Sequence, residues 1–263
     1  MKKYFVIGNP IDHSLSPELH NYWIKKSNIN AIYQKKLIKE EEIENVISKI
    51  KKEEINGINV TVPFKKSVIP FLDNLSPEAT EANSVNTIYK EKDKVIGHNT
   101  DIAGFELGLR HFKYNVKSKK VLILGAGGVV SSIVLALKKM GSSKIIISNR
   151  TREKAVELKK IFPYLEVIDW GKIPEFDMII NATSLGLKEN DEIKLNYKDI
   201  EKKKLFFDLI YNPKQTNFLK KAEQFGHQYI NGKMMFIYQA HQAFTVWHKI
   251  MPTIDDKIIK LLD

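Results

Sequence analysis

Residues 121–128 combine a short apolar run with a cluster of glycines, which is the pattern of a turn that binds a dinucleotide. Residues 121–124 suit a parallel strand that is buried on both faces. Gly125 and Gly127 would let the backbone turn tightly and approach a pyrophosphate, and residues 129–140 are typical of the helix whose first amides face the phosphates. Glycines at such a turn can also serve packing alone, so the turn by itself is weak evidence.

The next predicted strand, residues 144–148, is followed by a cluster of basic side chains. A dinucleotide-binding unit contacts the adenosine ribose at this point, roughly 20 to 25 residues after the first glycine. An NAD site would place an Asp or Glu there, whereas this chain has Arg150, Arg152 and Lys154. Cations suit a 2'-phosphate, so the segment favours NADP; the alternative is a set of ordinary solvated cations.

Two serines precede a predicted helix in the segment 8–17 of the N-terminal half. Ser14 and Ser16 would lie beside the start of this helix, and such an arrangement can bind a carboxylate. The alternative is that Ser16 caps the helix and Ser14 lies in the loop without a role.

A lysine and an aspartate follow two further predicted strands. Lys65 comes at the end of the strand predicted over 57–62, and Asp101 follows the strand predicted over 95–97. Each alone would be a surface residue or a helix cap. Together with the segment 84–87, which contains Asn86, they place a cation, a carboxylate and amide side chains at strand ends, as an active site would.

The elements that must position these residues alternate between strands and helices, so the sequence predicts an α/β protein. In the N-terminal half we expect strands at 4–7, 31–37 and 57–62, a hairpin over 85–97, and helices at 17–27, 40–52 and 101–112. In the C-terminal half we expect strands beginning near 121, 144, 165, 177 and 205, separated by helices, and a helical tail over 234–262. We therefore predict an N-terminal α/β substrate domain, residues 1–112, and a doubly wound Rossmann-type domain, residues 113–233, with a cleft between them and residues 234–263 packing back on the first.

Composition excludes several classes of function. The 263 residues contain no cysteine, which rules out disulfides, thiolate metal sites and cysteine nucleophiles. The apolar stretch near residue 5 is too short for a signal peptide or a membrane span, so a cytoplasmic enzyme without a membrane partner is expected. The net charge of +11 comes from scattered lysine pairs rather than one basic arm, so no nucleic-acid partner is expected. The seven histidines show no zinc-type spacing, and no metal is expected.

The ordered motifs from Gly8 to about Trp247 closely resemble those of the shikimate dehydrogenase family. Further motifs that carry the resemblance are Asn181-Ala-Thr-Ser-Leu-Gly186, Asp208-Leu-Ile-Tyr-Asn-Pro213 and Gln239-Ala-His-Gln-Ala-Phe244. The resemblance implies reversible reduction of 3-dehydroshikimate to shikimate with NADP(H), in the pathway to aromatic amino acids, and allows a homodimer. The chain departs from the family at Asn83-Ser84, at Val129-Val130-Ser131 and at Leu187, which concerns packing and cofactor affinity rather than the reaction.

The resemblance also implies a role for individual residues. The catalytic pair falls on Lys65 and Asp101. The substrate-binding positions fall on Ser14, Ser16, Thr61, Lys65, Asn86, Asp101, Tyr211 and Gln239. The cofactor-binding positions fall on Gly125, Ala126, Gly127, Gly128, Asn149, Arg150, Thr151, Lys154, Thr183, Leu209 and Gly232. An ammonium beside the substrate carbonyl would stabilise the developing alkoxide and deliver a proton, while the carboxylate orients it.

Two alternatives stay open. One is an NAD-dependent quinate/shikimate dehydrogenase, which the basic adenosine end and the pair Ser14 and Ser16 disfavour. The other is a non-catalytic regulator that binds NADP and contacts nucleic acid through its positive charge, which the presence of both Lys65 and Asp101 disfavours.

Overall fold

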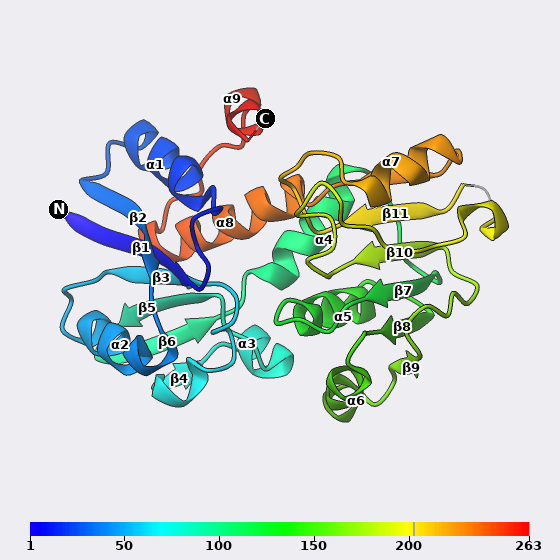
Figure 1. Ribbon diagram of the computed structural model, residues 1–263. Helices are drawn as coiled ribbons and strands as arrows, with labels where there is room; N and C mark the ends of the chain where they lie inside the picture. Colours follow the sequence, from blue (N-terminus) through cyan, green and yellow to red (C-terminus); the bar gives the residue numbers. More distant parts are fainter. Residues whose placement is uncertain (202, 263) are drawn as a thin grey trace. The chain divides into compact units, whose positions relative to one another are not determined.

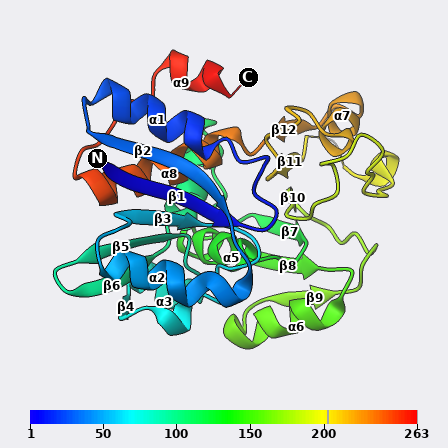
Figure 2. The same ribbon diagram turned by 60° about the vertical axis from the view of Figure 1, so that its left-hand side comes forward.

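The computed structural model describes residues 1–201 and 203–262, which form two compact units (Figures 1 and 2). The first unit comprises Met1–Gly104 and Ile237–Asp263, and the second comprises Phe105–Phe236. Each unit is built on a six-stranded sheet. No helix in the described ranges is both long and apolar enough to cross a membrane.

The sheet of the first unit is mixed. Its strands in spatial order are β2 (Ala31–Leu37), β1 (Lys2–Gly8), β3 (Gly57–Val60), β5 (Thr87–Glu91), β6 (Lys94–His98) and β4 (Asn74–Leu75). Strands β2, β1 and β3 are parallel, whereas β5 runs antiparallel to both β3 and β6. The predicted β5–β6 hairpin is confirmed. The predicted strand over 57–62 ends earlier, at Val60, and continues into a turn.

Successive strand residues face opposite sides of this sheet, and the two sides differ in chemistry. On one side, Ile7, Ile58 and Ile88 pack against helix α2 (Ile43–Lys51) in an apolar core. On the other side, Tyr33 stacks on His20 of helix α1 (Ser16–Lys26), with ring centroids 4.2 Å apart. Helices α1 and α2 lie on opposite sides of β1 in both views (Figures 1 and 2).

Further helices complete the two units. They are α3 (Pro77–Ala82), α4 (Asp101–His111), α8 (Lys233–His248), α9 (Asp256–Leu261) and the 3-10 helices η1 (Glu40–Glu42) and η2 (Ile69–Phe71). The helix predicted over 40–52 divides into η1 and α2. The alternative in which Ser16 caps a helix that begins at residue 17 is wrong: Leu15 holds the N-cap position, and Ser16 is the first helical residue.

The sheet of the second unit is entirely parallel. Its order is β12 (Gln228–Ile230), β11 (Leu205–Asp208), β10 (Met178–Asn181), β7 (Lys120–Leu124), β8 (Lys144–Ser148) and β9 (Glu166–Ile168). In chain order this is 6-5-4-1-2-3, the order of a doubly wound dinucleotide-binding sheet, so the predicted fold class is confirmed. The order reverses between β7 and β10, which is where such sheets bind ligands.

Helices cover both faces of the second sheet. Helices α5 (Val130–Lys139), α6 (Arg152–Ile161) and α7 (Asn217–Gln224) and the 3-10 helix η3 (Tyr197–Asp199) lie along the chain between its strands. The ring of Phe206 in β11 packs against that of Phe218 in α7, with centroids 5.2 Å apart. The ring of the next residue, Phe207, packs against that of Phe105 in α4, with centroids 5.4 Å apart. The expectation that helices separate all the strands is wrong for β9 and β10, which an irregular segment joins, and for β10 and β11, where only η3 is described.

We expect Gly57→Ala to lower the free energy of unfolding by about 1 to 3 kcal/mol, the usual cost of overpacking. A Cβ at residue 57 would lie 2.6 Å from Trp247 Nε1, and this indole is fixed by donating to the Ile88 carbonyl at 3.2 Å. The control is Gly127→Ala, whose Cβ would meet nothing nearer than the Ala182 carbonyl at 4.0 Å. Urea unfolding measures both, and equal midpoints would contradict this packing.

Candidate active site

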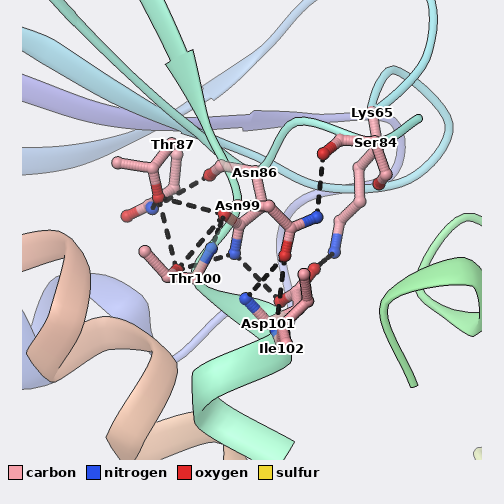
Figure 3. Close-up of polar contacts among 9 residues, drawn as sticks. Lys65, Ser84, Asn86, Thr87, Asn99, Thr100, Asp101 and Ile102 are labelled. Atoms are coloured by element: carbon pink, nitrogen blue, oxygen red, sulfur yellow. Dashed lines mark hydrogen bonds and ion pairs between the residues drawn. The ribbon is translucent and has the colours of Figure 1, made fainter. Parts of the chain in front are cut away.

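A buried ion pair joins Lys65 and Asp101 (Figure 3). Lys65 Nζ lies 2.5 Å from Asp101 Oδ2, and the two side chains are 9% and 6% exposed. Lys65 lies in the turn after β3 rather than at the strand end, and Asp101 begins α4. Charges so far removed from water persist only when they are paired and hydrogen-bonded, so the surroundings must satisfy both groups.

The start of α4 fixes the backbone that carries Asp101. The side-chain oxygen of Asn99 accepts hydrogen bonds from the amides of Asp101 and Ile102, at 3.1 and 3.3 Å. The side-chain nitrogen of Asn99, Nδ2, donates to the Ser84 carbonyl at 2.8 Å, and this bond connects the start of α4 to the loop before β5. A carboxylate in the first turn of a helix is stabilised by the positive end of the helix dipole.

Asn86 connects the ion pair to the sheet. Its Nδ2 donates to Asp101 Oδ1 and to Thr100 Oγ1, both at 2.9 Å, and its Oδ1 accepts from the Thr100 amide at 2.8 Å (Figure 3). Both amide hydrogens of Asn86 therefore have partners within the protein. In this arrangement Asn86 holds the second carboxylate oxygen of Asp101, which leaves Lys65 bound to the first.

Two polar residues on the same face of the sheet extend this network. Asn59 Nδ2 donates to Thr87 Oγ1 at 3.1 Å, and Thr87 Oγ1 donates to Asn86 Oδ1 at 3.1 Å. Asn59 and Thr87 are paired across β3 and β5, so the strand register places them side by side. The sequence patterns assigned neither residue a role. A polar residue inside the short strand 57–60, all of whose residues are buried, was the signal that could have identified Asn59.

The two serines predicted to bind a carboxylate lie together. Ser14 Oγ donates to Ser16 Oγ at 3.1 Å, and the Ser16 amide donates back to Ser14 Oγ at 3.3 Å. Ser16 is buried and Ser14 is half-buried. The Ser14 hydroxyl is therefore accessible to a ligand, whereas the Ser16 hydroxyl is buried and accepts a hydrogen bond from Ser14.

The other predicted substrate residues are divided between the two units. Thr61, directly after β3, and Gln239, in α8, are half-buried residues of the first unit. Tyr211 belongs to the second unit, where its ring stacks on Phe236 with centroids 4.4 Å apart.

The glycine turn after β7 has the geometry that a pyrophosphate needs. Gly125 has φ +112°, and a Cβ there would lie 2.7 Å from the Ala182 carbonyl oxygen, so only glycine fits. Gly127 is exposed, and a Cβ there would meet nothing nearer than the Ala182 carbonyl oxygen at 4.0 Å, so the backbone at this residue is accessible to a ligand. Helix α5 begins at Val130, three residues later, with its N-terminus at this turn.

The basic segment after β8 contains one cation that is already paired. Arg152 Nη1 lies 2.5 Å from Asp169 Oδ1, so the Arg152 guanidinium is already part of an ion pair. Arg150 and Lys154 are exposed, and Asn149 Nδ2 shapes the turn by donating to the Thr151 carbonyl at 2.7 Å. Arg150 and Lys154 therefore supply a donor set that suits a 2'-phosphate, and together with the glycine turn they fit NADP. The described residues include no group of His, Asp and Glu side chains that could hold a metal ion.

Known protein families match both halves of the chain. Residues 6–88 match the shikimate dehydrogenase substrate binding domain, and residues 106–225 match the shikimate / quinate 5-dehydrogenase family. Over 264 residues the chain is 63% identical to a shikimate dehydrogenase (NADP(+)) from Pelagibacter ubique (strain HTCC1062), and the match covers 100% of both chains. The chain belongs to the shikimate dehydrogenase family.

Solved structures of shikimate dehydrogenases share the fold. The crystal structure of the Aquifex aeolicus enzyme has a TM-score of 0.90 at 38% identity, covering 100% of this chain and 97% of that one. A Thermus thermophilus shikimate 5-dehydrogenase, solved in complex with NADP(H) and shikimate, has a TM-score of 0.90 at 28% identity, covering 100% and 98%.

A second buried carboxylate holds two predicted cofactor loops of this family member. Asp208 Oδ2 accepts from Thr216 Oγ1 at 2.6 Å, and Asp208 Oδ1 accepts from Asn181 Nδ2 at 3.0 Å. Asn181 Oδ1 accepts in turn from the hydroxyl of Thr183 at 2.7 Å. Leu209 follows Asp208 directly, and its carbonyl lies so close to Gly232 that no side chain fits at residue 232. Asp208 therefore connects the loop that carries Thr183 with the loop that carries Leu209, and Gly232 packs against the second of these loops.

We expect Asp208 to make the stability of the protein depend on pH. Burial raises the pKa of Asp208 from 3.8 to about 6, although its hydrogen bonds act in the opposite direction. Since the folded-state pKa lies above the unfolded-state pKa, the contribution of Asp208 to stability is full below about pH 4 and is lost as the pH rises through about 6. The difference between a pKa of 3.8 and one of about 6 corresponds to a loss of about 3 kcal/mol.

Asp208→Asn removes this titration and keeps a side chain of the same shape. The free energy of unfolding of the wild type minus that of the variant should therefore fall by about 3 kcal/mol between about pH 4 and pH 7. Urea unfolding at several pH values measures the difference. A difference that does not change with pH would show that Asp208 does not titrate in this range.

Proposed function

We infer that this chain catalyses the reversible NADPH-dependent reduction of 3-dehydroshikimate to shikimate, a step in aromatic amino acid biosynthesis. The buried pair of Lys65 and Asp101 is the observation that carries this proposal, because it supplies an ammonium and an orienting carboxylate in a family whose relatives are named for this reaction with NADP(+). The basic segment at Arg150 supports NADP as the cofactor.

Lys65 is the residue that acts on the substrate oxygen. In the reduction, the ketone oxygen gains negative charge, and the Lys65 ammonium stabilises this charge and donates a proton to it. The oxidation of shikimate runs the same step in reverse, so the Lys65 amine accepts the hydroxyl proton and becomes the ammonium. Asp101 keeps the ammonium aligned, since its Oδ2 binds Nζ while Asn86 and the start of α4 hold the carboxylate in place.

The remaining residues of the first unit bind and orient the substrate. Ser14 and Ser16 donate hydrogen bonds to the substrate carboxylate, so the site selects substrates that carry this charged group. Thr61, Asp101 and Gln239 bind ring hydroxyls, and Asn86 does so by giving up its hydrogen bond to Thr100. Tyr211 is assigned to carboxylate binding on the family resemblance. Polar groups of this kind reject analogues that lack the hydroxyls, because unpaired buried donors are costly.

The second unit holds the cofactor. The backbone of Gly125, Ala126, Gly127 and Gly128 binds the pyrophosphate, and Asn149, Arg150, Thr151 and Lys154 bind the adenosine end. Thr183, Leu209 and Gly232 are the remaining residues assigned to cofactor binding. When bound, the nicotinamide supplies or accepts the hydride.

Three further proposals concern organisation. Residues 1–112, with 234–263, form the substrate domain and residues 113–233 the NADP-binding domain. The absence of cysteine agrees with a cytoplasmic location, where thiols stay reduced and disulfides are rare. A homodimer is a prediction that light scattering would test.

Steady-state oxidation of shikimate with NADP and with NAD tests the proposed function. We expect turnover with shikimate, and a kcat/KM for NADP at least tenfold above that for NAD, since a charge-assisted pair with the 2'-phosphate is worth about 1.5 to 3 kcal/mol. The absence of shikimate oxidation would overturn the proposed reaction, and a preference for NAD would overturn the cofactor.

We expect Lys65→Ala to lower kcat by a factor of roughly 10² or more, the scale of a positioned acid-base group. The KM for NADP should stay unchanged, which checks that the second unit is intact. A kcat within about threefold of wild type at saturating substrate would refute the catalytic role of Lys65.

We expect Arg150→Ala to raise the KM for NADP more than tenfold and to leave that for NAD little changed, because a charge-assisted pair with the 2'-phosphate is lost. Arg152→Ala is the matched control, since Arg152 is two residues away and already paired with Asp169. Equal losses for NADP and NAD, or equal losses in the two variants, would contradict the assignment of Arg150.

A further inference from the structure

A fully buried threonine, Thr87, contacts the side chain of Asn86 on the polar face of the first sheet (Figure 3). Thr87 Oγ1 lies 3.1 Å from Asn86 Oδ1 and 3.1 Å from Asn59 Nδ2. Thr87 begins β5, and its side chain is closed off from solvent, so its hydroxyl cannot contact a ligand. Any effect of this hydroxyl on a substrate must therefore pass through a neighbouring side chain.

Groups that can only accept set the direction of these hydrogen bonds. Asn59 Nδ2 lies 3.1 Å from the Asn86 carbonyl oxygen, which can only accept, so the amide nitrogen of Asn59 faces this side. Its second hydrogen is donated to Thr87 Oγ1, and its oxygen accepts from the Tyr33 phenol at 2.7 Å. Because Thr87 already accepts from Asn59, its single proton is available for Asn86 Oδ1 at 3.1 Å, which is nearer than Thr100 Oγ1 at 3.4 Å.

The Asn86 amide is oriented in the same way from its other side. Its oxygen accepts from the Thr100 backbone amide at 2.8 Å, which can only donate, and its nitrogen donates to the Asp101 carboxylate at 2.9 Å. The Thr100 hydroxyl is a further partner of the Asn86 nitrogen, at 2.9 Å. These partners all belong to residues 100 and 101, near the start of α4. Among the described residues, Thr87 is therefore the one that holds the Asn86 side chain from the sheet.

Binding of the substrate would leave Asn86 dependent on this support. In the proposed function, Asn86 binds a ring hydroxyl by giving up its hydrogen bond to Thr100 Oγ1. The Asn86 nitrogen then donates one hydrogen to Asp101 and one to the substrate, while the Asn86 oxygen stays bound to the Thr100 amide and the Thr87 hydroxyl. A donor on the amide oxygen keeps the side chain in place and also strengthens the amide nitrogen as a donor, because linked hydrogen bonds polarise one another.

We propose that Thr87 is a positioning residue for the substrate: its hydroxyl, which is itself fixed by Asn59, holds the Asn86 amide so that the amide nitrogen reaches both Asp101 and a ring hydroxyl. This inference rests on the proposed function, in which Asn86 binds the substrate. It adds to that function a buried pair, Thr87 and Asn59, that acts on the substrate without contacting it.

The test is the steady-state oxidation of shikimate at saturating NADP by Thr87→Val, Thr87→Ser, Asn86→Ala and the double variant of Asn86→Ala with Thr87→Val. Valine lacks the hydroxyl but keeps the β-branch that suits a strand, whereas serine keeps the hydroxyl. Thr245→Val is the control, because the Thr245 hydroxyl donates within its own helix, to the His241 carbonyl at 2.8 Å. Melting temperatures and the KM for NADP check that each variant is folded.

We expect Thr87→Val to raise the KM for shikimate about three- to tenfold, the effect of losing one hydrogen bond. The kcat should stay within about threefold of wild type, because Asn99 still fixes the start of α4 that carries Asp101. Thr87→Ser and Thr245→Val should keep the KM within about twofold of wild type, since neither loses the hydrogen bond to Asn86. In the Asn86→Ala background, Thr87→Val should add nothing, because the Thr87 hydroxyl acts through Asn86.

The outcomes separate this inference from the function on which it rests. If Asn86→Ala raises the KM and Thr87→Val does not, the role of Thr87 is refuted while substrate binding by Asn86 stands. If Thr87→Val adds its full effect to Asn86→Ala, or Thr87→Ser loses as much as Thr87→Val, positioning through Asn86 is also refuted. If Asn86→Ala itself leaves the KM unchanged, substrate binding by Asn86 fails, and the role of Thr87 fails with it. If Thr87→Val does not fold, Thr87→Ala replaces it in each comparison, with the same expected results.

Discussion

The buried ion pair of Lys65 and Asp101 is the interaction on which the organisation of the first unit depends. Removing two charges from water costs several kcal/mol per ion, and a single contact between them does not offset this cost. The surrounding groups act together on Asp101: Asn86 binds its second oxygen, and Asn99 fixes the start of α4. The pair is therefore a fixed ammonium with a defined direction, which is what stabilisation of a developing alkoxide requires.

The alternation of side chains along the strands of the first sheet places the polar network on one face of that sheet. Because neighbouring residues of a strand face opposite sides, Ile58 and Ile88 pack into the apolar core, whereas Asn59 and Thr87 face the polar side. A shift of the register by one residue would bury the amides in the core and turn the isoleucines toward the site. The fold and the polar network of Asn59 and Thr87 thus depend on the same strand register.

Features that follow from local sequence patterns could be predicted, whereas contacts that depend on how the strands pair could not. The parallel sheet of the second unit could be predicted, because an apolar strand, a glycine turn and a helix follow one another within about twenty residues. The role of Ser16 as a helix cap was wrong, because pattern alone does not tell an N-cap from a first helical residue. Tyr33 and Asp208 carried no local signal that separates them from ordinary strand residues, since their partners lie on other strands and helices.

The central claim is that Lys65 and Asp101 act as one unit, and a double-mutant cycle in kcat tests it most directly. Lys65→Ala, Asp101→Asn and the double variant would be compared at saturating shikimate and NADP. If the carboxylate acts by orienting the ammonium, the double variant should have a kcat within about threefold of that of the worse single variant, since residues that act as a unit are not additive. Losses that multiply, so that the double variant is slower by the product of the two single effects, would show that the two residues act independently and would contradict this account.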